Sequence, residues 1–509
     1  MRPYRYMQDQ PTLTVLLRCA AVGAIAIAVS GCIPRDRSAQ LSVTLPSRWS
    51  NGQTSVQALA QTELATWWRR YRDPEINRLV DSALAANPTL DEARERVFAA
   101  RSLARAQGAQ RLPTVDGAAS ATTQSRLSGP TQGLNAAGED FFGESPRSTV
   151  GVFQAGFDAR WELDFFGRVR NSALAAEYAA LVASEELHDA RFILIAEVVR
   201  TYLELRGAQG RRAVILREIA ARRSLLDSVR VQQTAGTSSE FDVQRARSTY
   251  EAARARAPAA DLAVRVALQR LATLAGSARP DERLATRSRG IGIISTAVGP
   301  LPASILRWRT DIRRAEVVIA QRAAEADVAE ADLYPRFMLA GTLDIAGNLL
   351  GKPLLGTPVT LTGGPAISIP LVDWGMRANV VRAREAQWRE AVAAYRSAVL
   401  RGVEDVEIAL ATIRATRSRL ERQSTAVTAA SRALDLADRQ YRGGLTGLTE
   451  RLQAETDLRQ AELDLADARE GAAVASVGLF KALGTPPGPD RPAAPRTAPE
   501  PAPAIAVLQ

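Results

Sequence analysis

The sequence contains few of the residues on which enzymes and metal proteins depend. Among 509 residues there are one histidine, His188, and two cysteines, Cys19 and Cys32. Because no second histidine or spare cysteine could complete a metal site, His188 is expected to be a packing residue in a helix. The chain also lacks a phosphate-binding glycine loop, a nucleophile elbow and a paired-histidine motif. These absences argue against an enzyme and against a bound metal or other cofactor.

Aromatic residues and long basic stretches are scarce too. Only 5% of residues are aromatic while 46% are apolar, which favours helices rich in alanine and leucine over a β-sandwich. The formal net charge of +10 comes almost wholly from arginines, which are interspersed with carboxylates along helical faces. This mixture is typical of a solvated surface, and no stripe of basic residues with interleaved aromatics indicates nucleic-acid binding.

The first 31 residues have the pattern of a secretory signal peptide, with early arginines and a following apolar stretch. Residues 29–32 read Val-Ser-Gly-Cys, which resembles a bacterial lipobox and implies cleavage before Cys32 and lipid on its thiol. An ordinary signal with an incidental cysteine is the alternative. It is disfavoured because Cys19 would leave with the signal, so that Cys32 is the single cysteine of the mature chain. Ile33 stands where an aspartate would resemble an inner-membrane retention signal, which favours the outer membrane.

Two proline-free helical patterns of equal length, 168–235 and 376–443, dominate the remaining chain. Each follows an Asp-aromatic-Gly corner and ends at a glycine turn. The spacing between corner glycine and turn glycine is 69 positions in both cases (236 − 167 and 444 − 375). At a rise of about 1.5 Å per residue each helix would span roughly 100 Å and would need a partner along its length. The corners and turns are marked by six residues: Asp164, Gly167, Gly236, Asp373, Gly375 and Gly444.

The period changes from helical to alternating in two segments, 113–164 and 335–373. In the first segment, apolar residues such as Phe157 and Trp161 alternate with charged residues such as Asp158. In the second segment, the alternation continues through Ile369 and Leu371. Strands of about ten residues with one apolar and one charged face are typical of a membrane β-barrel. A soluble sheet packed on a core is the alternative. Stretches rich in glycine and proline, 127–147 and 347–364, are expected to be exposed loops.

The two halves of the chain are an internal duplication. Residues 89–93 match 311–315 at a displacement of 222, and the corner and turn glycines match at a displacement of 208 (375 − 167). We expect each returning helix to be extended end to end by the short helix of the other repeat. The predicted organisation begins with a lipoprotein signal peptide (1–31) and a lipidated tether (32–62). The first repeat (63–275) contains hairpin 113–164, long helix 168–235 and returning helix 237–274, and an equatorial connection (276–302) follows it. The second repeat (303–484) contains hairpin 335–373, long helix 376–443 and returning helix 445–483, and a flexible tail (485–509) ends the chain.

Four membrane strands cannot form a closed barrel alone, because the two open edges would leave backbone groups unsatisfied in lipid. Single-chain barrels begin at about eight strands. Several copies are therefore needed, and three chains would supply 3 × 4 = 12 strands around a lumen wide enough for solutes.

Several of these motifs resemble TolC-type outer-membrane efflux proteins. They are residues 161–168 (Trp-Glu-Leu-Asp-Phe-Phe-Gly-Arg), residues 369–375 (Ile-Pro-Leu-Val-Asp-Trp-Gly), Leu301-Pro302 with 307–315, and the two glycine turns. The lipobox points to the lipoprotein (NodT or OprM-like) branch. The resemblance implies a mainly α fold with membrane β: four transmembrane strands and long periplasmic helices per chain, in a trimeric 12-stranded β-barrel continuous with an α-helical barrel.

The resemblance further implies the passive exit duct of a tripartite efflux pump in the outer membrane, extending into the periplasm. The expected partners are two further copies of the chain, outer-membrane lipid, a periplasmic adaptor, and an inner-membrane transporter of the resistance-nodulation-division class, which supplies the energy and largely selects the substrate. A periplasmic adaptor or a structural coiled-coil lipoprotein is the alternative. Either would show a single helical hairpin and no duplicated strand pairs.

In the resembling family, an aspartate and an arginine one turn past the second glycine turn help to close the periplasmic aperture. The matching positions here are Gln453 and Thr456, and Thr449 stands where the family has a hydrophobic constriction residue. The chain therefore departs from the family at all three positions.

Other charged residues near the turns could close the aperture instead. We expect a network of Asp242 and Arg245 with Glu450 and Arg451, in which Gln453 forms a neutral hydrogen-bonding ring. The alternative is that these charges merely solvate helix ends, since exposed ion pairs contribute only about 0–1 kcal/mol.

Overall fold

The computed structural model describes residues 49, 64–125, 130–134, 140–144, 149–286, 290–294, 306, 308–350 and 359–485. The described chain forms two compact units. The sheet unit contains residues 108–172 and 323–384, and the helical unit contains residues 49–107, 173–322 and 385–485. The predicted signal peptide, Cys32 and most of the carboxyl-terminal tail lie outside the described residues. Within the described ranges, no helix is long and apolar enough to cross a membrane.

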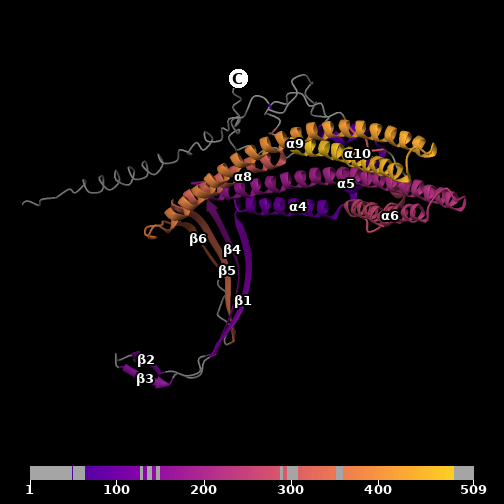
Figure 1. Ribbon diagram of the computed structural model, residues 1–509. Coiled ribbons are helices and arrows are strands. Elements are labelled where there is room, and N and C mark those ends of the chain that lie inside the picture. Colours follow the sequence, from indigo (N-terminus) through magenta and orange to yellow (C-terminus); the bar gives the residue numbers. More distant parts are fainter. Residues whose placement is uncertain are drawn as a thin grey trace, which may run out of the picture. The chain divides into compact units, whose positions relative to one another are not determined.

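The main sheet of the sheet unit is four-stranded and antiparallel and is built from two hairpins (Figure 1). Its strands, in spatial order, are β1 (Thr114–Ser125), β4 (Thr149–Leu163), β5 (Arg336–Leu350) and β6 (Val359–Ser368). The central pair joins the two repeats, because β4 belongs to the first and β5 to the second, with Ala159 opposite Gly341. In the described chain β1 and β6 are therefore the two edges of this sheet.

Three details of the sheet differ from the sequence prediction. The expected loop 127–147 contains a further short hairpin, β2 (Pro130–Leu134) and β3 (Asp140–Glu144). The expected loop 347–364 is shorter, because β5 continues to Leu350 and β6 begins at Val359. The predicted alternation through Ile369 and Leu371 is wrong as a strand, since β6 ends at Ser368. Pro370 lacks the N–H that a ladder requires, which accounts for this end.

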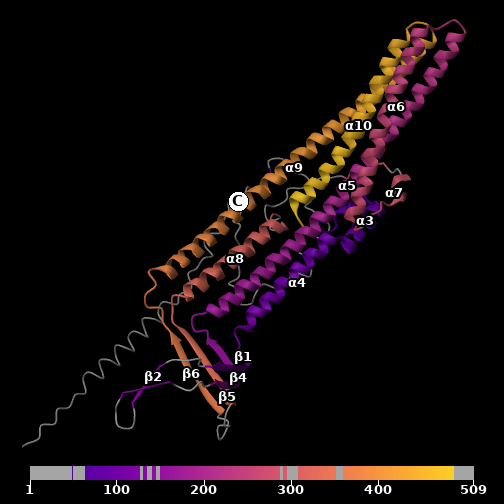
Figure 2. The same ribbon diagram turned by 90° about the horizontal axis from the view of Figure 1, so that it is seen from below.

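The helices repeat one arrangement twice. Within the helical unit α9, α8, α5 and α4 lie side by side in that order (Figure 2). Both long helices have 67 residues and begin 208 positions apart (376 − 168), and both short helices have 22 residues and begin 222 apart (310 − 88). The bounds of the helices are η2 (Trp67–Tyr71), α3 (Pro74–Ala86), α4 (Pro88–Ala109), α5 (Arg168–Thr234), α6 (Glu240–Leu274), α7 (Glu282–Thr286), α8 (Thr310–Ala331), α9 (Met376–Arg442) and α10 (Leu448–Leu483).

Each returning helix is extended by the short helix of its own repeat. Asn87, before α4, donates from Nδ2 to the Leu274 carbonyl at the end of α6 (2.9 Å). Arg309, before α8, donates from Nη1 to the Ala482 carbonyl at the end of α10 (2.9 Å). The predicted pairing with the other repeat is therefore wrong. Both junctions occupy equivalent positions, since the donors lie 222 apart (309 − 87) and the acceptors 208 apart (482 − 274).

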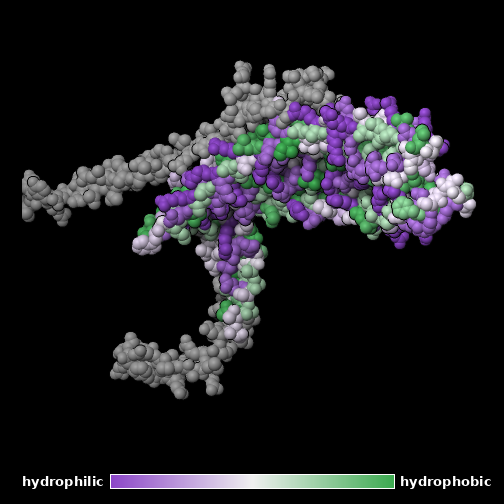
Figure 3. All heavy atoms as spheres, viewed as in Figure 1, coloured by the Kyte–Doolittle hydropathy of each residue, from purple (hydrophilic) through white to green (hydrophobic). Residues whose placement is uncertain are grey.

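The core of the helical unit joins the amino-terminal segment to the second repeat. The Trp67 ring of η2 stacks on Phe480 of α10, with ring centroids 5.0 Å apart. Nearby, the Tyr71 hydroxyl and Ser476 Oγ are 2.6 Å apart, and burial raises the pKa of Tyr71 to about 12. On the face seen in Figure 3, polar and apolar residues are interspersed over the helices. This mixed surface is what the distribution of arginines and carboxylates predicts.

A glycine completes each junction, and its replacement should be costly. Gly276 has φ +71°, and a Cβ there would overlap the carbonyl oxygen of Ala86. We expect Gly276→Ala to lower the free energy of unfolding by about 2–4 kcal/mol, because left-handed strain adds to overpacking. Gly210→Ala in α5 is the control: no atom lies within 4 Å of the added Cβ, and alanine has the higher helix propensity. Denaturant titration of the helical circular dichroism signal measures both, and equal midpoints would contradict the prediction.

Candidate functional site

The first strand-helix corner fastens β4 to α5. The Asp164 carboxylate accepts the backbone N–H groups of Val169 (3.1 Å) and Arg170 (2.7 Å), so it caps the helix. Gly167 has φ +79°, which lets the chain turn sharply before the helix begins. Beside it, Glu162 on the strand accepts two bonds from the Arg168 guanidinium at 2.8 and 2.5 Å. Strand and helix are thus joined by charged groups on both sides of the turn.

The second corner also has an aspartate that caps the helix, and two of its residues, rather than one, are left-handed. Asp373 accepts the N–H groups of Gly375 (3.0 Å) and Arg377 (3.2 Å), and the bond from Arg377 contributes most to lowering the pKa of this carboxyl. Trp374 and Gly375 have φ +54° and +82°, two consecutive left-handed residues. The Trp374 side chain is exposed in the single chain. Both corner aspartates singled out by the sequence thus cap a long helix.

The two tip turns have identical hydrogen bonds. After α5, the N–H of Thr237 donates to the Gln232 carbonyl (2.9 Å), and after α9 the N–H of Leu445 donates to the Gln440 carbonyl (2.9 Å). Gly236 and Gly444 have φ +76° and +71°. A backbone hydrogen bond between the first and sixth residues of a turn that contains a left-handed glycine is the Schellman motif, which ends many helices. Each long helix therefore stops where the sequence places a glycine.

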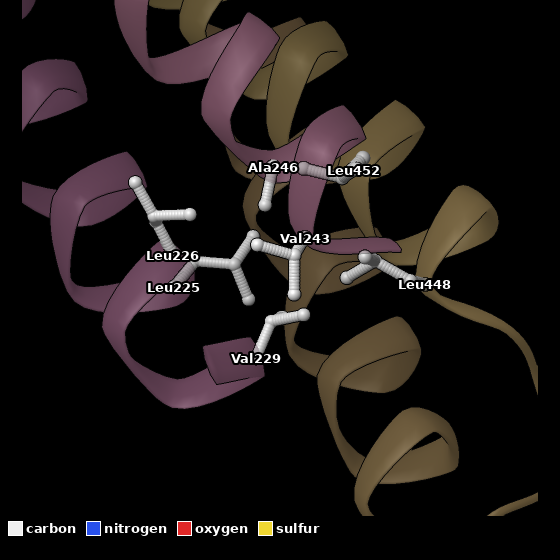
Figure 4. Close-up of a cluster of buried hydrophobic side chains, with 7 residues drawn as sticks. All are labelled: Leu225, Leu226, Val229, Val243, Ala246, Leu448 and Leu452. Atoms are coloured by element: carbon white, nitrogen blue, oxygen red, sulfur yellow. The ribbon is translucent and has the colours of Figure 1, made fainter. Parts of the chain in front are cut away.

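A single apolar cluster packs the two turns together (Figure 4). Its members come from α5, α6 and α10, so it joins the first repeat to the second. Tyr441, at the end of α9, packs against it and donates from its hydroxyl to Gln232 Oε1 (2.9 Å). The tip is therefore one packed structure. The cluster consists of Leu225, Leu226, Val229, Val243, Ala246, Leu448 and Leu452.

Asp242 and Arg245 lie at the beginning of α6 and have different partners. Asp242 and Ser239 form a capping box, each accepting the other's backbone N–H at 3.2 Å. The hydrogen bond from the Ser239 hydroxyl is the main cause of the lowered pKa of Asp242. Arg245 instead donates from Nη1 to Thr449 Oγ1 on α10 (2.6 Å). Asp242 thus stabilises its own helix, whereas Arg245 links the two turns.

The candidates on α10 are also paired differently from the predicted network. Arg451 binds Asp438 of α9, with Nε and Oδ1 2.8 Å apart, and has Glu455 on its other side at 3.6 Å. Gln453 donates to Asp457 Oδ1 one turn further along the helix (2.8 Å). Glu450 lies in the first turn of α10. The structure of one chain therefore pairs Arg245 with Thr449 and Arg451 with Asp438.

Comparison with known proteins identifies the family. The family model described as outer membrane efflux protein matches residues 79–277 and 301–485, about three quarters of the chain. The chain belongs to the outer membrane efflux protein family. Nodulation protein T of Rhizobium leguminosarum bv. viciae is 29% identical to this efflux protein over 91% of the chain and 92% of its own length. The pyoverdine export outer membrane protein OpmQ of Pseudomonas aeruginosa is 28% identical, covering 93% and 96%.

A solved structure agrees with this assignment. The outer-membrane channel OprN is 29% identical and superposes with a TM-score of 0.73, over 85% of this efflux protein and 97% of OprN. The predicted fold class, mainly helical with a small antiparallel membrane sheet, is confirmed, as is the predicted function as an outer-membrane channel of an efflux system. The alternatives, an adaptor or a structural coiled-coil lipoprotein, are excluded by the match across both repeats.

Sequence reasoning missed a buried ionic cluster above the tip of this efflux channel. Glu218 of α5 is completely buried and accepts bonds from Arg222 Nε (2.9 Å) and from Arg256 Nη2 of α6 (2.8 Å). Arg222 also donates to Thr456 Oγ1 of α10 (3.2 Å). Two helices thus meet at the Glu218 carboxylate, and Arg222 links them to α10 of the second repeat. The only signal in the sequence is Glu and Arg at i and i+4, which is common on any helix surface.

Proposed function

We propose that the chain is the exit duct of a tripartite efflux pump and works as a homotrimer. The observation that carries the proposal is the four-stranded sheet whose edges, β1 and β6, have no neighbouring strand in the described chain. In lipid each unpaired backbone group costs several kcal/mol, so the edges must meet other copies. Three copies give 3 × 4 = 12 strands, and their six 67-residue helices would extend the barrel into the periplasm.

A periplasmic adaptor and an inner-membrane transporter of the resistance-nodulation-division class would complete the pump. The duct itself is passive, and the transporter supplies both energy and substrate choice. Relatives named for different cargoes support this division, since one is a pyoverdine export protein and another, SrpC of Pseudomonas putida, belongs to a solvent efflux pump. The described chain holds these partners' expected docking region, the packed tip around Gly236 and Gly444.

Two measurements on the purified full-length protein test the proposed duct. We expect an oligomer on gels without heating that becomes a monomer after boiling, and discrete conductance steps when the protein is added to a planar bilayer. A monomer that carries no current would contradict the proposal.

The lipid anchor is a further part of the proposal, although Cys32 lies outside the described residues. We expect mass spectrometry of the purified protein to find an acylated peptide that begins at Cys32. Cys32→Ala should still insert, because the lipid only adds membrane affinity to strands that already span. A mature protein with an unmodified start at another residue would rule out the anchor.

The aperture is proposed to lie at the tip, held by the charged residues that surround the two turns. Replacing both Asp242 and Arg245 with alanine should raise single-channel conductance well above the wild-type value, because it removes the carboxylate half of the α6 capping box and the Arg245–Thr449 link together. Asp435→Ala with Arg439→Ala is the matched control, an exposed i, i+4 pair on α9 whose charged atoms are 2.7 Å apart. Unchanged conductance in the first variant would mean that closure lies elsewhere.

A further inference from the structure

The end of α10 borders a hollow in the helical unit with a volume of about 640 Å³. Its lining comes from α5, α9, α10 and the start of α8, so both repeats contribute to it. This volume lies within the range of about 300–1,000 Å³ that is typical of small-molecule sites. The charged residues of the lining carry a net charge of −1 (2 − 3), and they are Asp189, Arg309, Asp311, Asp405 and Lys481.

The first repeat fills the equivalent place with ion pairs. On α5, Glu197 accepts hydrogen bonds from Arg200 of the same helix (2.7 Å) and from Arg270 of α6 (2.5 Å). The long helices and the returning helices of the two repeats are both displaced by 208 positions (376 − 168 and 482 − 274). The counterparts of these three residues in the second repeat are, in the same order, Asp405, Ile408 and Gly478.

The second repeat has thus kept the carboxylate and lost both of these guanidinium groups. Asp405 accepts a bond from Arg309 Nη2 (2.8 Å), yet its side chain remains 51% exposed and can accept a further donor. At Gly478, no neighbouring atom of the described chain lies within 4 Å of an added Cβ. The space that the Arg270 side chain occupies in the first repeat is therefore open here, and it leaves room for a cationic group in the hollow that Asp405 lines.

The walls of the hollow suit an organic cation better than a metal ion. Ile193 of α5 and Ile408 of α9 both line it and are 43% and 57% exposed, so apolar surface is available in the same hollow as the carboxylate. Covering this surface with the apolar part of a ligand removes it from water, which is favourable. Among the described residues, no group of three or more histidine, cysteine, aspartate or glutamate side chains could hold a metal ion.

The hollow lies on the side of α10 that faces away from the amino-terminal segment. Phe480 of α10 stacks on Trp67 of η2, and Ser476 contacts the same segment. Val474 and Gly478, each two residues from Ser476, line the hollow instead. Residues two apart in a helix are separated by about 200° around its axis, so they point to opposite sides. A duct that passes solutes keeps its lumen open, so η2 belongs outside the helical wall and the hollow opens inward.

We propose that this hollow is a weak binding site for organic cations on the inner wall of the duct. The cationic group takes the place of the Arg270 guanidinium, next to Asp405, and the apolar part of the ligand lies on Ile193 and Ile408. The inward opening rests on the proposed function as a duct, whereas the cation site rests on contacts within one chain. Lys481, an exposed cation of the lining, opposes a bound cation and keeps the binding weak. A weak site leaves transport through the duct passive.

Equilibrium dialysis of the full-length protein in detergent tests the site with a matched pair of probes. Tetraphenylphosphonium and tetraphenylborate have nearly the same size and shape but opposite charge, and we expect only the phosphonium to bind. Gly478→Arg restores the side chain that the first repeat has at this position and should abolish the binding. Gly471→Arg is the matched control, about two turns earlier on the same face of α10, and should retain it. An added Cβ meets no neighbouring atom of the described chain at either glycine, so both variants should fold.

Two charge substitutions test the sign of the site. Asp405→Asn should weaken phosphonium binding about two- to fivefold, as expected for an exposed ion pair. Lys481→Met should strengthen it, because a like charge is removed. Loss of binding in Lys481→Met, or tighter binding of the borate than of the phosphonium, would overturn the cation site. Equal phosphonium binding by the wild type and by Gly478→Arg would place the probe elsewhere and would overturn it as well.

Current recordings separate this inference from the proposed function. The phosphonium should lower the mean single-channel current of the wild type and of Gly471→Arg but not that of Gly478→Arg, with a protein-free bilayer as the background. Binding in dialysis without any effect on the current would overturn the inward opening. Channels that conduct but neither bind the phosphonium nor are blocked by it would overturn the site and leave the duct intact. A protein that binds the phosphonium but conducts no current would overturn the duct and retain the cation site.

Discussion

Replacing Glu218 with alanine will lower the free energy of unfolding by about 3–5 kcal/mol, because it leaves a buried guanidinium without its counter-charge. The side chain of Arg222 is only 4% exposed, and its Nε donates to Glu218 at 2.9 Å. Arg256 of α6 loses its bond to the same carboxylate. The variant should therefore loosen α5 from α6 as well as destabilise α5 itself.

A double variant separates a lost counter-charge from lost packing. Glu218→Leu with Arg222→Met replaces both charges by apolar groups of similar size and should recover most of the stability, as buried ion pairs often can be replaced at little cost. Glu251→Ala is the matched control, since Glu251 and Arg254 form an exposed i, i+3 pair on α6. Its expected loss is below about 1 kcal/mol. Denaturant titration compares the three, and similar losses in all of them would refute the ionic explanation.

Leu400→Pro should be the most damaging change on α9. Residue 400 lies in the interior of this 67-residue helix, where proline removes a backbone hydrogen bond and clashes with the preceding turn, at a cost of about 3 kcal/mol or more. The Leu400 side chain is 60% exposed, so little of the effect can come from packing within the chain. A kink here would interrupt one wall of the proposed duct.

Leu400→Ala controls for the lost side chain, since it keeps the backbone donor and has a high helix propensity. The proline variant should show reduced oligomer yield and reduced helical circular dichroism, and the alanine variant should resemble the wild type. Ala196→Pro tests the equivalent wall in α5, where residue 196 is buried and packing is lost as well. If both proline variants assembled and conducted normally, continuous helices would not be required for the channel.

The sequence alone determined the elements whose signals are local. The long helices begin at the predicted residues 168 and 376 and end one residue before the predicted ends, because a glycine that adopts a left-handed conformation stops each one. The corner aspartates were recognisable for a similar reason, since a carboxylate just before a helix binds its free N–H groups. The duplication and the family resemblance also follow from the order of such local signals.

Only the tertiary structure decided which distant segments meet. Because the two short helices have equal lengths, each returning helix could be extended by the short helix of its own repeat or of the other repeat. The contacts of Asn87 with Leu274 and of Arg309 with Ala482 show that it is the helix of its own repeat. The partners of Arg245 and Arg222 were equally hidden, because this chain has many arginines and an ion pair between distant helices leaves no periodic trace in the sequence. Helical period and glycine turns depend on neighbours in the chain, whereas these contacts depend on which side chains the packed helices bring within about 3 Å of each other.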